Sequence, residues 1–476
     1  MENFNDIFKI LKEHTGTCLI TEEDREVSYP ELVTHIRENL NMLNQHQLQS
    51  VNGQPCAILD TSMGWKCIPI ILAFILNRIT VVPVDCFHNP KQAESIKKKF
   101  NGSLFIDTHT VNENGVLQKD AIDLEETQFI HELSNIAFVL FTSGTTGDPK
   151  GVKLSYANVL SNLKGILEYF TLEKYDRLFI IRPLTNASAI TGELLPALIK
   201  GSSFYLKPPN QSPLVSPVKM KQHSITVFCS TPSVVINLLP IMSRHKLNNL
   251  RLIVLSGECL NQAQLKIIKS NIPEVALWNA YGLTEASPRV SCNKQILDAS
   301  CVGLPLSNLH VKIVNDKGEP CTDGELGELM VSGANVMKGY FNDPIQTSKK
   351  MKDGWLYTSD KAMLKDGRLY VVGRKDEMII RSGMNIFPNE IEGYLVNHPN
   401  VKEAIVFGKK DVKIGERIYA WIVLSNKQLK TKPSDLFQYF IDEGIDSLAW
   451  PNVIEIKEEL PKTLTGKVSR NWEETK

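Results

Sequence analysis

The segment FVLFTSGTTGDPKGVKLS, from Phe138 to Ser155, has residue types and spacing suited to binding a polyphosphate. Glycines let the backbone approach phosphate oxygens, hydroxyl and amide N–H groups can donate to those oxygens, and Lys150 can add positive charge. The six small residues after the hydrophobic stretch are Thr142, Ser143, Gly144, Thr145, Thr146 and Gly147. The segment therefore predicts a triphosphate-binding loop that follows a strand.

This loop does not fit the Walker pattern, which would need glycine at Pro149 and serine or threonine at Gly151. It resembles the signature loop of the acyl-adenylate-forming superfamily, which includes acyl-CoA synthetases, peptide-synthetase adenylation domains and firefly luciferase. Further segments carry the same resemblance in the same order along the chain. They are NAYGLTEAS (279–287), GWLYTSD (354–360), VVGRKDE (371–377) and ELPKTLTGKVSRN (459–471).

The resemblance implies roles for the residues of NAYGLTEAS. Asn279 would face the adenine amino group, and Ala280 and Tyr281 would flank the base. Thr284 would reach the α-phosphate, and Glu285 would hold Mg²⁺, since a carboxylate is the hard oxygen donor that Mg²⁺ prefers beside phosphates. The resemblance also places Gly257 in this ATP site.

The later segments would complete the catalytic machinery. Asp360 and Arg374 match the family pair at the ribose, where a carboxylate can accept two hydroxyl donors. Asp376 falls on the family's hinge, and Lys467 falls on the catalytic lysine of a mobile C-terminal domain. After rotation about the hinge, Gly383 would line a tunnel for a phosphopantetheine thiol.

The pocket for the acid centres on Asn186, in TNASAITGEL, where amino-acid-activating relatives carry an aspartate. An amide offers a dipole and no countercharge, so burying an α-ammonium beside it would be costly. For Asn186 the alternative is a structural role, as a polar residue that caps a helix. The resemblance also places Arg289 at the pocket; it is interpreted as a surface residue, and the alternative is contact with a second carboxylate or a hydroxyl of the acid. The other predicted pocket residues are Ala187, Ile190, Cys229, Val254, Ser256, Ala280 and Pro288.

These features predict an ATP-dependent ligase that forms an acyl-AMP, releases pyrophosphate and transfers the acyl group to a pantetheine thiol. The acid is expected to be an aryl or other non-α-amino acid, and the thiol belongs to CoA or to a carrier protein. One alternative is a stand-alone adenylation enzyme for an amino or β-amino acid. Another is a degenerate adenylate-binding scaffold, which should lack Lys467, Glu285 or Asp360.

The elements that must position these residues follow an α/β pattern. Short β-branched runs alternate with helical stretches over the first three hundred residues, and closely spaced hairpin strands follow near residues 310–335 and 362–373. We expect residues 1–374 to form two α/β subdomains plus a small β subdomain. For residues 377–476 the pattern predicts the order helix, strand, strand, helix, strand, which is typical of a small α+β lid domain.

Composition narrows the function classes. The 53 basic and 53 acidic residues balance, so no global field favours nucleic acid as a partner. The apolar run Trp65–Leu76 is too short to span a bilayer and predicts a buried helix. Nine cysteines without C-x-x-C spacing predict reduced thiols. With no signal peptide expected at the start, the chain is expected in the cytoplasm.

Overall fold

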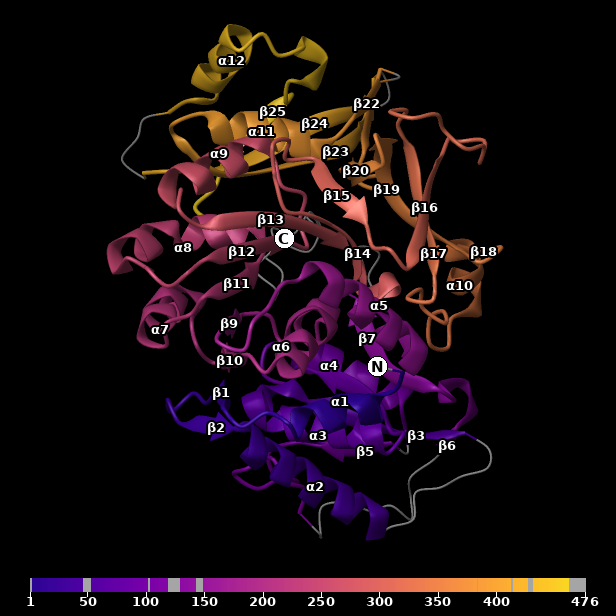
Figure 1. Cartoon of the computed structure of the whole chain (residues 1–476). Helices are drawn as coiled ribbons and strands as arrows, with labels where there is room; N and C mark the ends of the chain where they lie inside the picture. The colour runs from indigo at the N-terminus through magenta and orange to yellow at the C-terminus, as the bar shows by residue number, and fades with distance from the viewer. Residues whose placement is uncertain are drawn as a thin grey trace.

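The computed structural model describes residues 2–45, 53–101, 103–118, 129–142, 149–382, 384–411, 414–426 and 431–461 of the 476-residue chain. Figure 1 shows the early residues at the base, the central residues in the middle and the sheet formed by residues after 378 at the top. Among the described residues, no helix has the length and apolar content to cross a bilayer. The nine cysteines all lie in the described ranges and form no disulfide there, and most of them are buried.

A six-stranded sheet holds the strands on either side of the predicted phosphate loop. Its order is β5-β3-β4-β7-β8, with β6 beside β3; β7 and β8 are antiparallel, whereas β3, β4, β5 and β7 pair in parallel. The strands are β3 (Gln54–Asp60), β4 (Thr80–Val84), β5 (Leu104–Ile106), β6 (Phe129–Ile130), β7 (Ile136–Thr142) and β8 (Lys150–Ser155). The associated helices are α1 (Phe4–Leu11), α2 (Tyr29–Gln45), η1 (Thr61–Lys66), α3 (Cys67–Leu76), α4 (Pro90–Lys99) and η3 (His131–Leu133). The buried α3 confirms the predicted apolar helix, although Trp65 and Lys66 belong to the preceding 3₁₀ turn.

A fourteen-stranded sheet forms the middle of the molecule. From β1 through β10, β9, β11 and β12 to β13 its neighbours are parallel; beyond β13 they are antiparallel. Its strands are β1 (Thr17–Ile20), β2 (Glu26–Ser28), β9 (Arg177–Ile180), β10 (Ser203–Leu206), β11 (Val227–Ser230), β12 (Leu252–Ser256), β13 (Ala276–Gly282), β14 (Arg289–Asn293), β15 (Cys301–Pro305), β16 (Leu309–Val314), β17 (Gly327–Gly333), β18 (Met351–Lys352), β19 (Trp355–Lys365) and β20 (Arg368–Arg374). The change from parallel to antiparallel pairing confirms the predicted α/β pattern followed by hairpins.

Helices cover both faces of this sheet, because successive side chains of its buried strands point to opposite sides. Cys229, Val254 and Trp278 face the core beneath α5, whereas Phe228 and Ile253 face the core beneath α7, α8 and α9. The helices of this region are α5 (Tyr156–Tyr169), the π-helix η4 (Ser188–Leu194), α6 (Leu195–Lys200), η5 (Pro213–Val215), α7 (Ser216–Gln222), α8 (Pro232–His245), α9 (Gln262–Asn271), η6 (Thr284–Ala286) and α10 (Pro344–Lys350).

The residues after β20 form a smaller α+β unit with a separate sheet and core. The order predicted for it, helix, strand, strand, helix, strand, is confirmed by α11, β23, β24, α12 and β25. Its elements are β21 (Ile379–Arg381), β22 (Met384–Ile386), α11 (Pro388–Asn397), β23 (Val401–Asp411), β24 (Gly415–Leu424), α12 (Pro433–Asp442), η7 (Ser447–Ala449) and β25 (Val453–Ile456). Its core includes Ile391, Ile418 and Phe440. α11 packs against α9 of the larger part, and the Asn389 amide donates to the Val372 carbonyl at 2.7 Å.

Candidate active site

The two strands beside the predicted phosphate loop bring Thr142 and Lys150 opposite each other, at the ends of β7 and β8. The Lys150 ammonium lies 3.4 Å from the Gln346 side-chain oxygen and 5.7 Å from the centre of the Tyr340 ring. The loop residues predicted to bind phosphate, Ser143, Gly144, Thr145, Thr146 and Gly147, lie outside the described residues, as do Gly383 and Lys467.

Glu285, the predicted Mg²⁺ ligand, lies on the short helix η6 after β13. The Tyr340 hydroxyl donates to Glu285 Oε1 at 2.8 Å, and the Met337 N–H donates to the Glu285 carbonyl at 2.9 Å. Oε2 of Glu285 has no hydrogen bond to any described residue. Tyr340 therefore orients Glu285 and also lies beside Lys150, so the predicted metal and phosphate groups share one region.

Asn335, from a distant loop, and Ser287, in the turn itself, fix the turn that carries Thr284. Asn335 is fully buried, and its Nδ2 donates to the Ala286 carbonyl at 2.9 Å. The Ser287 hydroxyl donates to the Asn335 carbonyl at 2.7 Å, and Ser287 itself has a left-handed backbone with φ 69°. These bonds stabilise a turn that places Thr284 and Glu285 side by side at the end of β13.

The predicted ribose pair is brought together by the register of one hairpin. Asp360 on β19 lies opposite Arg374 on β20, and Arg374 Nη1 is 3.7 Å from Asp360 Oδ1. The Tyr281 hydroxyl also donates to Asp360. Burial raises the pKa of Asp360 to about 6 although Arg374 acts in the opposite direction.

Arg374 also pairs with the predicted hinge residue. Its Nε and Nη2 donate to the two carboxylate oxygens of Asp376 at 2.8 and 2.7 Å. Burial would raise the pKa of Asp376, but the bonds and charge of Arg374 outweigh burial and hold that pKa below its usual value. Arg374 thus connects Asp360, the predicted ribose ligand, to the start of the C-terminal unit.

The predicted adenine residues occupy the carboxyl ends of β12 and β13, the edge where ligands bind in parallel sheets. Asn279 is buried, and its Nδ2 donates to the Ala299 carbonyl at 3.0 Å; its side-chain oxygen has no described partner. An adenine amino group would need such an acceptor. Gly257 follows β12 with φ 91°, which favours glycine because side chains clash in that conformation.

The predicted acid-pocket residues gather on one face of the central sheet, beneath α5 and η4. Cys229 pairs with Val254, and Ser256 pairs with Ala280, across neighbouring strands. All of them, with Ala187, Ile190 and Pro288, are buried. Asn186 precedes η4, and its Oδ1 accepts the Ser188 N–H at 2.8 Å, so the amide has the local capping contact that was the structural alternative. Its Nδ2 has no hydrogen bond to a described residue.

Arg289 is not the surface residue that the sequence suggested. It is only 2% exposed. Its Nε donates to the Tyr169 hydroxyl at 3.1 Å and its Nη1 lies 3.4 Å from the Ser188 hydroxyl. Residue type alone favours exposure of an arginine, but the antiparallel register of β14 turns this side chain toward α5 and η4.

A second buried arginine lies on the same side of the sheet. Arg182 donates to Glu193 at 2.7 Å, and its Nη2 bonds the Ser256 carbonyl and hydroxyl at 2.9 and 3.0 Å. Glu193 is fully buried, and its Oε2 has no hydrogen-bond partner. Burial raises the pKa of Glu193 although both Arg182 and Arg289 act in the opposite direction.

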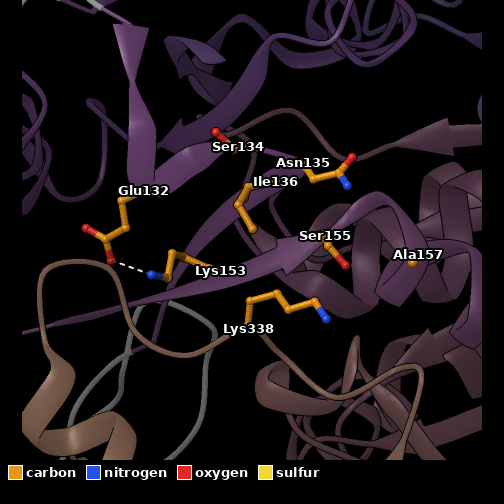
Figure 2. A pocket seen from close by; sticks show the side chains of 8 residues that line it. All are labelled: Glu132, Ser134, Asn135, Ile136, Lys153, Ser155, Ala157 and Lys338. Atoms are coloured by element: carbon orange, nitrogen blue, oxygen red, sulfur yellow. Dashed lines mark hydrogen bonds and ion pairs between the residues drawn. The ribbon is translucent and has the colours of Figure 1, made fainter. Parts of the chain in front are cut away.

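A cavity of about 410 Å³ lies elsewhere, beside β7 and β8. Figure 2 shows the ion pair between Lys153 and Glu132 on one side of it and the Lys338 ammonium pointing away from that pair. No residue predicted to bind ATP or the acid lines this cavity. It is therefore separate from the candidate active site.

Comparison with known proteins identifies the family. The model of the AMP-binding enzymes matches residues 11–341, and the model of the AMP-binding enzyme C-terminal domain matches residues 390–467. The chain belongs to the AMP-binding enzymes. It is an AMP-forming acid–thiol ligase of the acyl-adenylate-forming superfamily, as the motifs predicted.

Individual relatives of this ligase include acyl- and aryl-CoA ligases. The chain is 30% identical over 383 residues to a long-chain-fatty-acid–CoA ligase of Bacillus subtilis. The matched region covers 74% of this chain and 67% of that protein. It is 28% identical over 470 residues to the 2-succinylbenzoate–CoA ligase of Bacillus subtilis. This match covers 94% of this chain and 93% of that protein. A solved structure of o-succinylbenzoate CoA synthetase from the same organism, in complex with its acyl-adenylate intermediate, matches with a TM-score of 0.80 and 26% identity. The match covers 99% of this chain and 98% of that chain.

The motifs did not indicate several residues of the candidate site. Tyr340 orients Glu285 from 55 positions away, and Asn335 holds the Ala286 carbonyl from 49 positions away. Arg182 and Glu193 form an ion pair inside the pocket region. No local spacing indicates these contacts, because each depends on which strands and loops become neighbours.

Proposed function

We propose that this ligase condenses a carboxylic acid with ATP to an acyl-AMP and passes the acyl group to a pantetheine thiol of CoA or a carrier protein. The acid is aryl or another acid without an α-ammonium group. The observation that carries this proposal is the common location of Glu285, Lys150, Asp360 and Arg374 around the end of β13. Each of these groups suits one part of an ATP molecule.

The ribose end is supported by the surroundings of Asp360. A carboxylate can accept both ribose hydroxyls, and Arg374 beside it favours the ionised form. The Tyr281 hydroxyl already donates to this carboxylate, which fixes its orientation before nucleotide binds. Asp360 would therefore bind the sugar, while the flat wall of β13 beside it would receive the base.

The phosphate end is supported by the positions of Glu285, Lys150 and Thr284. The described residues hold no cluster of three or more potential metal-ligating side chains, which fits Mg²⁺, an ion usually bound through one or two carboxylates plus phosphates and waters. Glu285 would supply that carboxylate, with its unpartnered Oε2. When bound there, Mg²⁺ would neutralise charge on the phosphates. Lys150 would add positive charge at the same end, and Thr284 would donate to the α-phosphate.

The acid end is supported by its charge. Glu193 is the buried carboxylate among the described residues of this pocket region, and Arg182 already pairs with it. An incoming α-ammonium would meet Arg289 and would find no free carboxylate among those residues. Burying a cation beside another cation is strongly unfavourable, so the arrangement disfavours α-amino acids.

The second half-reaction depends on the C-terminal unit. We propose that it rotates about Asp376, so that Lys467 serves acyl-AMP formation and the segment at Gly383 then lines the thiol path. The paired bonds between Arg374 and Asp376 support a hinge at this point, because they join the ribose site to the first residues after β20. The boundary between 1–374 and 377–476 belongs to the same proposal.

Acid-dependent exchange of pyrophosphate into ATP tests the first half-reaction. Panels of aryl, fatty and α-amino acids are compared, and the product is then trapped with CoA and with holo carrier proteins. Exchange with aryl or fatty acids and thioester formation with either acceptor are expected. Exchange confined to α-amino acids, or no exchange with any acid, would contradict the proposal.

A further inference from the structure

The guanidinium of Arg289 is a buried cation without an anionic partner among the described residues. Its two hydrogen bonds go to neutral hydroxyls, those of Tyr169 and Ser188. Nη2 has no hydrogen bond to a described residue and lies next to Gly192, where an added Cβ would approach it to 3.3 Å. Burying a guanidinium usually requires a paired carboxylate, so this one lacks the partner that normally offsets desolvation.

The nearby ion pair does not supply that partner. Glu193 bonds Arg182 and makes no ion pair with Arg289. With Glu193 ionised, the three groups carry one surplus positive charge; with Glu193 protonated, the surplus is two. The region is therefore electropositive in either protonation state of Glu193.

The backbone of Arg289 is held in place by hydrogen bonds from a neighbouring helix. The Asn162 side chain on α5 donates to the Arg289 carbonyl at 2.7 Å and accepts the Arg289 N–H at 3.1 Å. This clamp fixes the backbone from which the guanidinium extends, and Tyr169 fixes its Nε. A planar guanidinium held in this way can form two parallel hydrogen bonds with a carboxylate.

Arg289 also lies at the correct end of the site to contact the acid. It follows the turn that carries Thr284, and β14 places it opposite Gly282 on β13. Its neighbours Ser188 and Gly192 belong to η4, the element that carries Ile190 of the predicted pocket. An acid that occupies this pocket would therefore extend from Thr284 toward Arg289.

We propose that Arg289 is a specificity-determining residue that binds a second carboxylate of the acid, so that the substrates are dicarboxylic acids activated at one end. This inference rests on the proposed function and names its substrate class. One carboxylate would be adenylated beside Thr284, and the other would pair with the guanidinium. Binding supplies the missing anion and leaves the Arg182–Glu193 pair intact.

Matched pairs of acids test the inference by pyrophosphate exchange. Each pair exchanges one methyl group for a carboxylate: butyrate and succinate, valerate and glutarate, and the three toluates with the three benzenedicarboxylates. The wild type should favour the dicarboxylic member of at least one pair at least about tenfold in kcat/KM. Preference for the methyl member in every pair would overturn the inference.

Three variants separate a charge role from a structural role. Arg289→Met should reverse the preference in the favoured pair, by about a hundredfold in the kcat/KM ratio, and should raise KM for the dicarboxylate more than it lowers kcat. Arg289→Lys should keep the order of preference at a lower rate. The control Lys294→Met removes an exposed charge that follows β14 and should leave the ratio unchanged. Equal loss for both members of the pair in Arg289→Met, with normal folding by circular dichroism, would assign Arg289 to the reacting carboxylate or to packing and would overturn the inference.

Calorimetric binding of the dicarboxylate to the enzyme without ATP separates this inference from the proposed function. If the wild type binds the dicarboxylate and Arg289→Met abolishes that binding, the inference is supported even when no exchange occurs. The absence of exchange would then contradict only the proposed function. Exchange with methyl acids and no binding or exchange of dicarboxylates would overturn the inference and leave the proposed function standing.

Discussion

The nucleotide end and the acid end of the candidate site are built on different principles. At the nucleotide end, Asp360 and Arg374 compensate each other's charge, and Glu285 is oriented by Tyr340. At the acid end, Arg289 is buried, and among the described residues its guanidinium hydrogen-bonds only to the neutral hydroxyls of Tyr169 and Ser188.

This difference indicates how the two ends divide their tasks. Groups that are already paired and oriented can bind the same ATP in every cycle with little reorganisation. A buried charge without an ion-pair partner favours a ligand of opposite charge and rejects others, which is a mechanism of specificity. The nucleotide end should therefore set the rate for all acids, whereas the acid end should set the choice among them.

The largest expected effect is on the activation step alone. Lys467→Ala should lower acyl-AMP formation by several powers of ten, because one charge-assisted contact made in the transition state can be worth about 3–4 kcal/mol. Thioester formation from added acyl-AMP should retain much more activity. Single-turnover assays of the two half-reactions measure this split. The control is Lys457→Ala, which changes a partly exposed lysine ten positions earlier that pairs with Glu455. Equal losses in both half-reactions would show that Lys467 has another role.

The ribose contact should make ATP affinity dependent on pH. The pKa of Asp360 in the free enzyme is raised to about 6, and ribose hydroxyls donate to the ionised form. As pH falls through 6, the enzyme must release a proton to bind ATP, so affinity should fall by up to about tenfold per pH unit. Calorimetry between about pH 5 and pH 8 measures the slope, with Asp360→Asn as the control for titration of ATP itself. Identical slopes in wild type and Asp360→Asn would exclude Asp360 from the ribose site.

A smaller effect is expected where Glu285 is oriented. Tyr340→Phe removes the donor to Glu285 Oε1 and leaves the aromatic ring beside Lys150. One hydrogen bond to a charged group contributes about 1.5–3 kcal/mol, so kcat/KM for ATP should fall by about ten- to a hundredfold. The concentration of Mg²⁺ needed for half-maximal activity should rise, while the ratio of activities with two acids should stay constant. A changed acid preference without a changed Mg²⁺ requirement would place Tyr340 in the acid pocket.

The smallest effect is expected at the entrance of η4. Asn186→Asp keeps an oxygen that can accept the Ser188 N–H, so the local turn should persist. The new carboxylate should shift selectivity toward cationic acids by less than about tenfold, because a new ion pair must first offset its own desolvation. Pyrophosphate exchange with matched aryl and amino acids measures the ratio. An unchanged ratio would remove the Asn186 side chain from the acid pocket.

Much of the nucleotide end could be predicted from sequence because its residues occur in short motifs with fixed geometry. Asp360 and Arg374 are fourteen positions apart, and a single hairpin places them opposite each other. The strands β7 and β8 likewise follow from hydrophobic runs on either side of a glycine-rich segment. Local patterns therefore carry both the secondary structure and the proximity of these groups.

The acid end could not be predicted to the same depth, because its contacts join distant segments. Arg289 was interpreted as exposed because arginine usually is, yet Asn162, 127 positions earlier, clamps its backbone inside the core. The ion pair between Arg182 and Glu193 depends on the π-helical turn at η4, which no residue pattern signalled. Burial of these charges is a property of the assembled fold.

The most direct test of the separation between the two ends is a double-mutant cycle. The kcat/KM values for a methyl acid and its dicarboxylic partner are measured in wild type, Asp360→Asn, Arg289→Met and the double variant. Asp360→Asn should lower both values by the same factor, Arg289→Met should reverse their ratio, and the two effects should multiply in the double variant. A ratio that changes as much in Asp360→Asn as in Arg289→Met would contradict the account.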